Sequence, residues 1–358
     1  MTVHILKPGM MSSLQDRGRY GHQHLGVSPS GAMDERAHRL AHLLAGNTAE
    51  QDLASLEITV QGPSLRFDEP TLFVLTGADM NASLDGLPVA VLRPTLARAG
   101  QTLTMQSAKP GQGARSYLSV YGGFQVESLL GSQSTHMRVG LGGFEGRALK
   151  KGDQIQLAQP LPNQEAALDK LQDVLDELRI YMPAALALAP RDRLRVMLDQ
   201  ADLFTDESLE LFQSQSYRIS PASERMGYRL EGQPLQRKTP KELLSAPTCF
   251  GTIQVPNDGQ PIVLMADRQT TGGYPRIGQV ASVDLAQVAQ RLPGQSLGFE
   301  VVSAEQAYAL SARQEQAFVR LNDSLEPLRQ ALTVCGINSI QAAPVQAELL
   351  TLPHIRMP

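Results

Sequence analysis

"LEITVQGPSLRFDEPTLFVLTGADM" occupies residues 56 to 80 and divides into short apolar runs separated by turn residues. Gly62-Pro63 lies between the first two runs, and Asp68-Glu69-Pro70 lies between the second and the third. Runs of four to eight residues bounded by Gly, Pro or Asp are typical of β-strands. The same pattern continues to Gln106, so we expect a barrel or a sandwich of short strands here.

A short motif recurs in both halves of the chain. Gly100-Gln-Thr-Leu-Thr-Met, Gly152-Asp-Gln-Ile-Gln-Leu and Gly294-Gln-Ser-Leu-Gly-Phe each begin with glycine and continue in alternation. Each is typical of a turn that leads into a half-buried strand. Chance similarity among β turns is the alternative, but occurrences in both halves favour two related β lobes.

The predicted fold is mainly β with a few helices, in two β-barrel lobes. One helix is expected at 34–45, where apolar residues recur at helical spacing. A second helix carries the leucine stripe Leu168, Leu171, Leu175 and Leu178 and joins the lobes, with partner binding as its alternative role. We expect an N-terminal lobe at 1–160, a helical linker at 161–190, a C-terminal lobe at 191–303, and a helix and tail at 304–358.

The composition excludes several classes of protein. The chain has 358 residues, 42% of them hydrophobic, and a net charge of −4. No basic field exists for a phosphate backbone, so nucleic acid is not an expected partner. Cys249 and Cys335 imply no disulfide framework. With no signal-like start and no apolar run of about 18 residues, we expect no membrane partner and a cytoplasmic location.

Four stretches combine glycine with charged or hydroxyl residues more densely than packing requires: residues 16–34, 115–147, 223–230 and 251–280. The last contains "LMADRQTTGGYPRIGQV" at 264–280, between two apolar runs that we interpret as strands. A tight hairpin there would need only about two to five residues. The excess of polar residues indicates a functional loop.

This loop has the chemistry of a site for an anion or an amide. Arginine offers a planar fork of donors to a carboxylate or a phosphate. Gln269, Thr270 and Thr271 offer short hydrogen bonds, and Gly272-Gly273 allows backbone N–H groups to approach a ligand. Asp267 is a candidate base or metal-facing carboxylate. The alternative is a set of salt-bridged barrel ends with glycines in the turns.

Several familiar sites are absent from the sequence. It contains no G-x-x-x-x-G-K-[ST] loop, no G-x-S-x-G elbow and no H-E-x-x-H segment. The histidines are too scattered to indicate zinc, so we predict no metal site on this chain. No Met-Lys-Met segment for covalent biotin is present.

At the four polar stretches the chain resembles the biotin-dependent carboxyltransferase family, which includes allophanate hydrolase subunit 2, the C subunit of bacterial 5-oxoprolinase and the regulator KipA. The resemblance runs from about Leu6 to Phe299. It is carried by LQDRGRYGHQHLGVSPSGAMD, RSYLSVYGGF, LGSQSTHMRVGLGGFEGR, SERMGYRL and GTIQVPNDGQPIVLMADRQTTGGYPRIG. It implies cyclophilin-like β-barrel lobes whose polar loop lies beside an active site shared with a partner subunit.

A chain without a biotin carrier or ATP-binding module is similar to the 5-oxoprolinase type, in which three subunits couple ATP hydrolysis to the opening of 5-oxo-L-proline to L-glutamate. The expected partners are the KipI-like B subunit and the LamB/YcsF-like A subunit, and the substrate is a small amide. ATP with Mg²⁺ is the cofactor of the complex, bound either on this chain or on a partner.

The resemblance also implies roles for individual residues. Arg225 and Arg276 would clamp an anion, with Asp267 as acid or base. Gln269, Thr270, Thr271 and Tyr274 would position the amide, and Arg115, Ser134 and Thr135 would contribute from the other lobe.

Two alternatives remain open. One is a carboxyltransferase component that moves a carboxyl group between carboxybiotin and urea or a related amide. The other is a KipA-like regulatory protein that antagonises a kinase inhibitor without catalysis.

Overall fold

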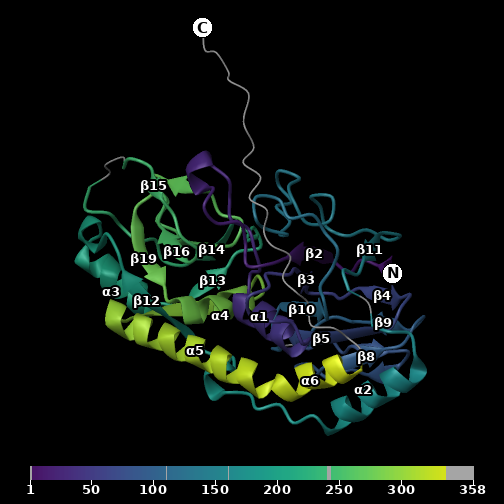
Figure 1. The fold of residues 1–358 in the computed structure, drawn as a ribbon. Helices are drawn as coiled ribbons and strands as arrows, with labels where there is room; N and C mark the ends of the chain where they lie inside the picture. Colours follow the sequence, from purple (N-terminus) through teal and green to yellow (C-terminus); the bar gives the residue numbers. More distant parts are fainter. Residues whose placement is uncertain (1, 110, 160, 240–242, 336–358) are drawn as a thin grey trace.

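The molecule consists of two β lobes that lie side by side in space. Two C-terminal helices, α5 (Ala304–Ser324) and α6 (Glu326–Val334), run along one edge of both lobes (Figure 1). The structure is a computed structural model that describes residues 2–109, 111–159, 161–239 and 243–335. Within these residues no helix is long and apolar enough to span a membrane.

The N-terminal lobe consists of two antiparallel sheets. Six strands follow the order β11-β1-β4-β9-β6-β7, and five follow the order β2-β3-β10-β5-β8. The bounds are β1 Thr2–Lys7, β2 Met11–Gln15, β3 Ser55–Thr59, β4 Ser64–Phe67, β5 Thr71–Gly77, β6 Ser83–Leu84, β7 Leu87–Pro88, β8 Thr95–Ala97, β9 Thr102–Thr104, β10 Arg115–Val120 and β11 Gln154–Gln156. The segment 56–80 thus supplies β3, β4 and β5, as its three apolar runs predict.

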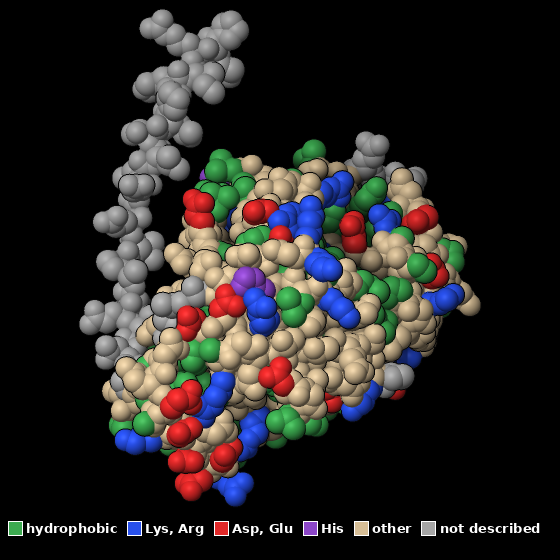
Figure 2. All heavy atoms as spheres, turned by 90° about the vertical axis from the view of Figure 1, so that its right-hand side faces the viewer, with side chains coloured by type: hydrophobic (Ala, Val, Ile, Leu, Met, Phe, Trp, Pro, Cys, Tyr) green, Lys and Arg blue, Asp and Glu red, His purple; other side chains and the backbone are tan. Residues whose placement is uncertain are grey.

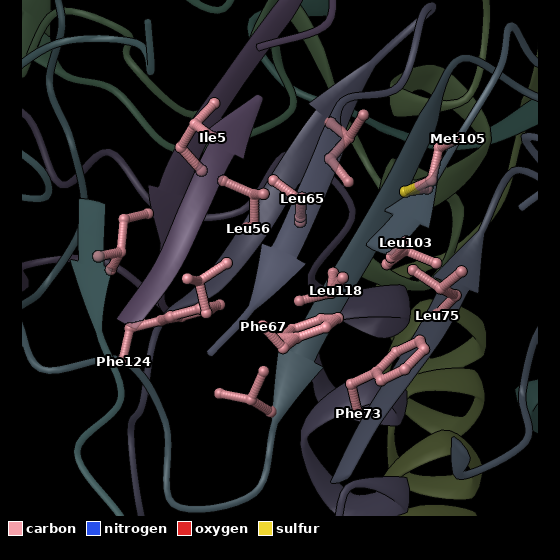
Figure 3. Close-up of a cluster of buried hydrophobic side chains, with 14 of the residues drawn as sticks. Ile5, Leu56, Leu65, Phe67, Phe73, Leu75, Leu103, Met105, Leu118 and Phe124 are labelled. Carbon is pink, nitrogen blue, oxygen red and sulfur yellow. The ribbon is translucent and has the colours of Figure 1, made fainter. Parts of the chain in front are cut away.

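The core of this lobe lies between the two sheets (Figure 3). Phe67 on β4 faces Phe73 on β5, and their rings stack with centroids 5.5 Å apart. The turns at Gly62-Pro63 and Pro70 direct β4 into one sheet and its neighbours β3 and β5 into the other. Ladder pairing therefore does not continue around this lobe, and its two packed sheets correspond to the sandwich, the second of the two arrangements expected for this region.

The C-terminal lobe is a closed barrel of seven strands in the order β12-β19-β16-β17-β14-β13-β20. Its bounds are β12 Arg193–Leu198, β13 Tyr217–Ile219, β14 Gly227–Glu231, β16 Thr252–Gln254, β17 Ile262–Leu264, β19 Arg276–Val280 and β20 Ser296–Val301; β15 Ala246–Pro247 and β18 Thr271–Gly272 form a separate ribbon. A parallel pairing of β12 with β20 closes the ring. The prediction of a mainly β chain with a barrel is confirmed.

The recurring glycine motif marks turns in both lobes. Gly100, Gly152 and Gly294 have φ angles of +85°, +91° and +87°. Side chains with a Cβ rarely adopt this left-handed region, so glycine suits each turn. The three glycines directly precede β9, β11 and β20, which confirms the predicted turn and strand at each place.

The helices are α1 Glu35–Leu44, α2 Glu165–Glu177, α3 Asp206–Ser214, α4 Leu285–Ala289, α5 Ala304–Ser324 and α6 Glu326–Val334, with short 3-10 turns η1 Gln23–Leu25, η2 Ala184–Leu186, η3 Ala201–Leu203 and η4 Ser282–Asp284. Asp34 caps α1 by accepting from the Ala37 backbone N–H at 2.8 Å. The helix expected at 34–45 is therefore confirmed. The domain boundaries stay a prediction.

The linker helix and the chain after α5 pack together. The predicted leucine stripe of α2 is buried with Leu328 and Leu332 of α6 in one apolar cluster. The tail expected after the C-terminal helix begins with a further helix, α6, whose Leu328 and Leu332 lie one helical turn apart. Residues 336–358 of the tail lie outside the described residues. Figure 2 shows acidic and basic side chains gathered side by side at the lower edge of the face that it presents.

Candidate functional site

A cleft of about 740 Å³ lies where the two lobes meet. The N-terminal lobe contributes Arg115 at the start of β10, and the barrel contributes Arg225 and Asp267 from the loops beside β14 and β17. Methionines and other apolar residues form much of the remaining wall: Met10, Met11, Val60, Met137, Met226 and Pro293. Three predicted site residues therefore line one cleft.

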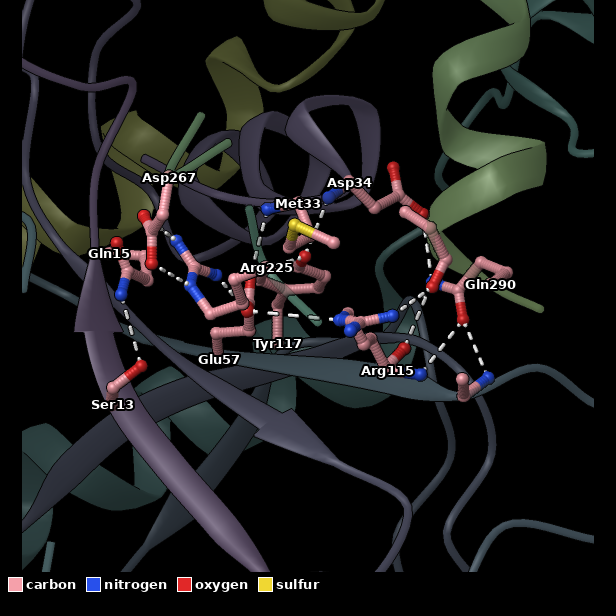
Figure 4. Close-up of polar contacts among 12 residues, drawn as sticks. Ser13, Gln15, Met33, Asp34, Glu57, Arg115, Tyr117, Arg225, Asp267 and Gln290 are labelled. Carbon is pink, nitrogen blue, oxygen red and sulfur yellow. Dashed lines mark hydrogen bonds and ion pairs between the residues drawn. The ribbon is translucent and has the colours of Figure 1, made fainter. Parts of the chain in front are cut away.

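Arg225 is bonded to two buried carboxylates, Asp267 in its own lobe and Glu57 in the N-terminal lobe (Figure 4). Its Nε and Nη2 donate to the two oxygens of Asp267 at 2.8 and 3.0 Å. Nη1 donates to Glu57 on β3, and Nη2 also donates to the Gly31 carbonyl at 2.7 Å. Four of the five N–H groups of this guanidinium are therefore bonded within the protein.

Glu57 connects Arg225 to the rest of the N-terminal lobe. Its second oxygen accepts from the Tyr117 hydroxyl and from the Met33 backbone N–H, both at 2.8 Å. The Tyr117 oxygen in turn accepts from the Asp34 backbone N–H at 2.7 Å. The carboxylate thus ties the barrel to the N-terminal sheet and to the start of α1.

Arg115 is less completely bonded than Arg225. Its Nη1 donates to the Tyr228 hydroxyl at 2.7 Å and to the Ala289 carbonyl. Its Nε has no hydrogen-bond partner among the described residues and lies 3.9 Å from Glu57, an ion-pair distance. Gln290 holds the backbone of Arg115 in place by accepting from its N–H at 2.9 Å and donating to its carbonyl at 3.0 Å. The Nε of Arg115 is buried, so its Nη2, which has no hydrogen bond to a described residue, is the donor left for an anion in the cleft.

The electrostatics of the network favour charged arginines. Burial alone would lower the pKa of Arg225, but the neighbouring carboxylates Asp267 and Glu57 outweigh it and place the pKa above its usual value. Burial likewise opposes charge on Arg115, and the groups around it, Tyr228 and Glu57 foremost, raise its pKa overall. The pKa of Tyr117 is raised well above its usual value by burial and by Glu57, so the phenol stays protonated and donates.

Glu57 was not among the predicted site residues. It lies in LEITV, where strand alternation places Leu56 and Ile58 on one face and Glu57 on the other. That second face is covered, so Glu57 is only 1% exposed. The signal that could have identified Glu57 is a single carboxylate within the apolar run of this strand. A buried charge needs a partner, so such a residue points to a cation elsewhere in the chain.

The predicted site residues of the polar loop at 264–280 lie in two different places in the structure. Asp267 reaches the cleft, but Arg276 on β19 does not line it and lies 2.8 Å from Asp199. Gln269 donates to Gln254 at 3.1 Å, and the Thr270 carbonyl accepts from the Thr248 N–H at 3.0 Å.

The tip of the same loop is open to solvent. Thr271 is exposed on the β15–β18 ribbon, and Tyr274 is 49% exposed. The structure therefore does not bring the predicted amide-positioning residues together with Arg225.

Ser134 and Thr135 are buried behind the cleft and do not line it. The Ser134 hydroxyl donates to Asp16, and the Thr135 hydroxyl donates to the Leu14 carbonyl at 3.0 Å. A Cβ on Gly142 would lie 2.4 Å from the Ser134 carbonyl oxygen, so the following glycine-rich loop closes tightly over this pair. Their observed contacts are structural, and their predicted ligand role stays a prediction.

Donors for a metal ion are few in this part of the molecule. Among the described residues no group of three His, Cys, Asp or Glu side chains could hold a metal ion. Both Asp267 oxygens already accept hydrogen bonds from Arg225. The site fits a small anion bound by guanidinium groups against a methionine-lined wall, and it does not fit Mg²⁺ held by this chain alone.

Comparison with known proteins gives relatives of nearly the same length. The chain is 40% identical over 313 residues to an Escherichia coli K12 protein named as the C subunit of 5-oxoprolinase, covering 87% of this chain and 94% of that one. It is 37% identical to the Haemophilus influenzae protein of the same name, covering 87% and 95%.

A solved structure shares the fold. The crystal structure of the Kluyveromyces lactis urea carboxylase matches with a TM-score of 0.79 and 28% identity, over 89% of this chain and 29% of that one. The model for the carboxyltransferase domain, subdomains A and B, matches residues 25–301, which include the barrel lobe, most of the N-terminal lobe and every residue of the network around Arg225 and Arg115. The chain therefore belongs to the family of the carboxyltransferase domain, subdomains A and B.

Proposed function

We propose that this chain is the C subunit of an ATP-dependent 5-oxoprolinase complex, which opens 5-oxo-L-proline to L-glutamate. The observation that carries the proposal is the match to two proteins named as 5-oxoprolinase C subunits along 94% and 95% of their length. The chain covers only 29% of the urea carboxylase, so that larger protein contains much that this chain lacks.

The chemistry of the cleft suits this substrate class. The substrate is a small lactam with one carboxylate, and the cleft combines arginine donors with an apolar methionine wall. Arg115, which keeps unbonded donors, would bind the carboxylate or the developing negative charge. Arg225 would add its remaining N–H, held in place by Asp267 and Glu57.

Opening the lactam needs activation, because resonance stabilises the amide. ATP would supply the phosphoryl group that activates the lactam oxygen. Water then adds at the ring carbonyl carbon and the ring C–N bond breaks, which leaves the free amine and an acyl phosphate. A second water hydrolyses this acyl phosphate, which releases inorganic phosphate and leaves the new carboxylate of L-glutamate, with ADP as the other product. Asp267 acts in this scheme by orienting Arg225, and its predicted role as acid or base requires one oxygen to leave that pair.

Partner subunits complete the proposal. We assign the ATP and Mg²⁺ site to a partner, or to a site completed by one, since the described residues hold no cluster for a metal. The proposed partners are the KipI-like B subunit and the LamB/YcsF-like A subunit.

The test is reconstitution from purified subunits. The three subunits together should release L-glutamate from 5-oxo-L-proline in the presence of ATP, and this chain alone should release none. Robust release by the single chain, or none by the three together, would refute the proposal.

The urea carboxylase match favours a second candidate, a carboxyltransferase component that acts with a separate biotinylated chain. Transfer of labelled carboxyl from carboxybiotin to urea by this chain would support it. Reconstituted ATP-dependent glutamate release without biotin would exclude it.

A further inference from the structure

A second cavity, distinct from the cleft, lies where the linker crosses between the lobes. It has a volume of about 370 Å³ and shares no lining residue with the cleft. Its walls come from α1, from the linker segment 184–191, from β12, from the η4–α4 segment and from α5. Elements of both lobes thus meet around one cavity.

Four arginines line this cavity: Arg36, Arg191, Arg195 and Arg313. Arg195 is neutralised by the buried Asp284, to which its Nε donates at 2.9 Å. Arg191 contacts the half-exposed Glu300 at 2.8 Å. These two cations therefore have carboxylate partners.

The other two arginines are poorly neutralised. Arg36 lies 3.7 Å from Asp34, whose oxygens already accept from the Ala37 N–H and from Gln290. The Nε of Arg36 is buried without a hydrogen-bond partner among the described residues. Arg313 on α5 is exposed and has no hydrogen bond or ion pair with any described residue. A positive charge therefore remains in the cavity although the chain as a whole is negative.

Two backbone carbonyls of the linker segment beside the cavity are already bonded. Arg36 donates to the Leu186 carbonyl at 2.7 Å, and Gln287 donates to the Ala189 carbonyl at 2.6 Å. These bonds fix the linker from α1 on one side and from α4 on the other. The cavity is thus preformed, with donors in excess of acceptors.

We propose that this cavity binds a small phosphate-bearing molecule. A phosphate carries up to two negative charges and matches the planar fork of arginine, so it suits Arg36 and Arg313. The volume exceeds that of a bare ion, and Ala184, Ala185, Leu188 and Leu310 offer an apolar wall for an organic group. The site is separate from the proposed chemistry in the cleft and does not depend on it.

Calorimetric titration of the full chain tests this proposal, with ADP, inorganic phosphate and L-glutamate as separate probes. ADP and phosphate should bind saturably, and glutamate should not. Arg313→Gln should raise the dissociation constant for ADP at least tenfold, the effect of one charge-assisted hydrogen bond. Arg313 has no partner within the described residues, so its replacement should leave the melting temperature unchanged.

Arg320→Gln is the matched control. Arg320 is an exposed arginine about two turns further along α5 and lines none of this cavity. Its replacement removes the same charge and should change ADP affinity less than twofold. Equal ADP binding by Arg313→Gln and the unmodified chain, no saturable binding of ADP or phosphate up to about 10 mM, or binding of glutamate alone would each overturn the proposal.

Discussion

Arg225 and Arg276 each lie 2.8 Å from an aspartate, yet their surroundings differ in almost every other respect. The side chains of Arg225 and Asp267 are 4% and 6% exposed between the lobes. Those of Arg276 and Asp199 are 24% and 43% exposed at the edge of the barrel. Nε of Arg225 is aligned to donate to Asp267, whereas Nε of Arg276 is not aligned for a hydrogen bond.

The difference teaches that the distance between two charges says little about what the pair does. Water screens the exposed pair, so its loss changes the free energy of unfolding little. In the buried site, removing one partner leaves the others charged in a poorly solvated place. Asp267 therefore fixes Arg225 within the barrel, and Arg225 holds the lobes together through Glu57. Arg276 makes its contacts within the barrel lobe, to Asp199 and to the Pro247 carbonyl.

The largest effect is expected for Arg225→Met. This change leaves Glu57 and Asp267 buried without their cation, so the free energy of unfolding should fall by about 3–5 kcal/mol. Urea unfolding at pH 7 measures it, with Arg218→Met on an exposed barrel position as the control, expected within about 0.5 kcal/mol. Arg225→Lys keeps the charge and should recover folding if Arg225→Met is insoluble. If Arg225→Met lowers the free energy of unfolding by less than about 1 kcal/mol, the buried contacts of Arg225 do not tie the lobes together.

Glu57→Gln examines the other side of the same network. The amide keeps the shape but removes the charge that pairs with Arg225, so we expect a loss of about 1.5–3 kcal/mol. Glu127→Gln is the control, because Glu127 is exposed on the same lobe and has no partner among the described residues. Urea unfolding of both variants should separate them clearly. If the two variants unfold alike, Glu57 is not the anchor that its contacts indicate.

The contrast between buried and exposed groups extends to histidine. His38 and His42 on α1 are buried, and burial lowers their pKa to about 3 and about 4. Between these values and the usual 6.5, the unfolded chain binds protons that the folded chain does not, so stability falls as the pH falls below about 6.5. At pH 5 each histidine should account for a loss of about 2 kcal/mol.

Urea unfolding at pH 7 and pH 5 checks this, with His38→Gln expected to remove about 2 kcal/mol of the pH dependence. His24→Gln, at an exposed position, should remove none of it. Burial raises the pKa of Asp52 to about 6, so this carboxyl makes the folded chain more stable as the pH falls, opposite to the histidines. Asp52 is present in every variant, so the difference between His38→Gln and the unmodified chain reports on His38 alone. An identical pH dependence in His38→Gln and the unmodified chain would contradict the prediction.

The parts of this molecule that local pattern determines could be predicted. Alternation and turn residues predicted the strands of 56–80, and the apolar spacing within 34–45 predicted α1. Arg115, Arg225 and Asp267 were predicted as site residues, and all three line the cleft. Each belongs to a stretch where polar residues exceed what packing needs.

The rest depends on contacts between distant segments. Glu57 meets Arg225 across 168 positions of sequence, and Gln290 reaches Arg115 across 175. No spacing rule connects such pairs, so neither Glu57 nor Gln290 was predicted. Ser134 is the opposite case, a predicted site residue that does not line the cleft. Its hydroxyl donates to Asp16, which lies 118 positions away in the sequence.

The smallest effect on stability is expected for Arg276→Ala, and it completes the comparison with Arg225. An exposed ion pair contributes about 0–1 kcal/mol, so the variant should fold and unfold almost as the unmodified chain does. The sequence nevertheless predicts that Arg276 clamps an anion, which requires its guanidinium to bind that anion beside its contacts with Asp199 and the Pro247 carbonyl. Loss of such a donor should lower turnover of the reconstituted complex about a hundredfold, or about 3 kcal/mol in the transition state. Arg179→Ala in the linker is the control, and normal turnover with Arg276→Ala would leave this arginine a structural element of the barrel edge.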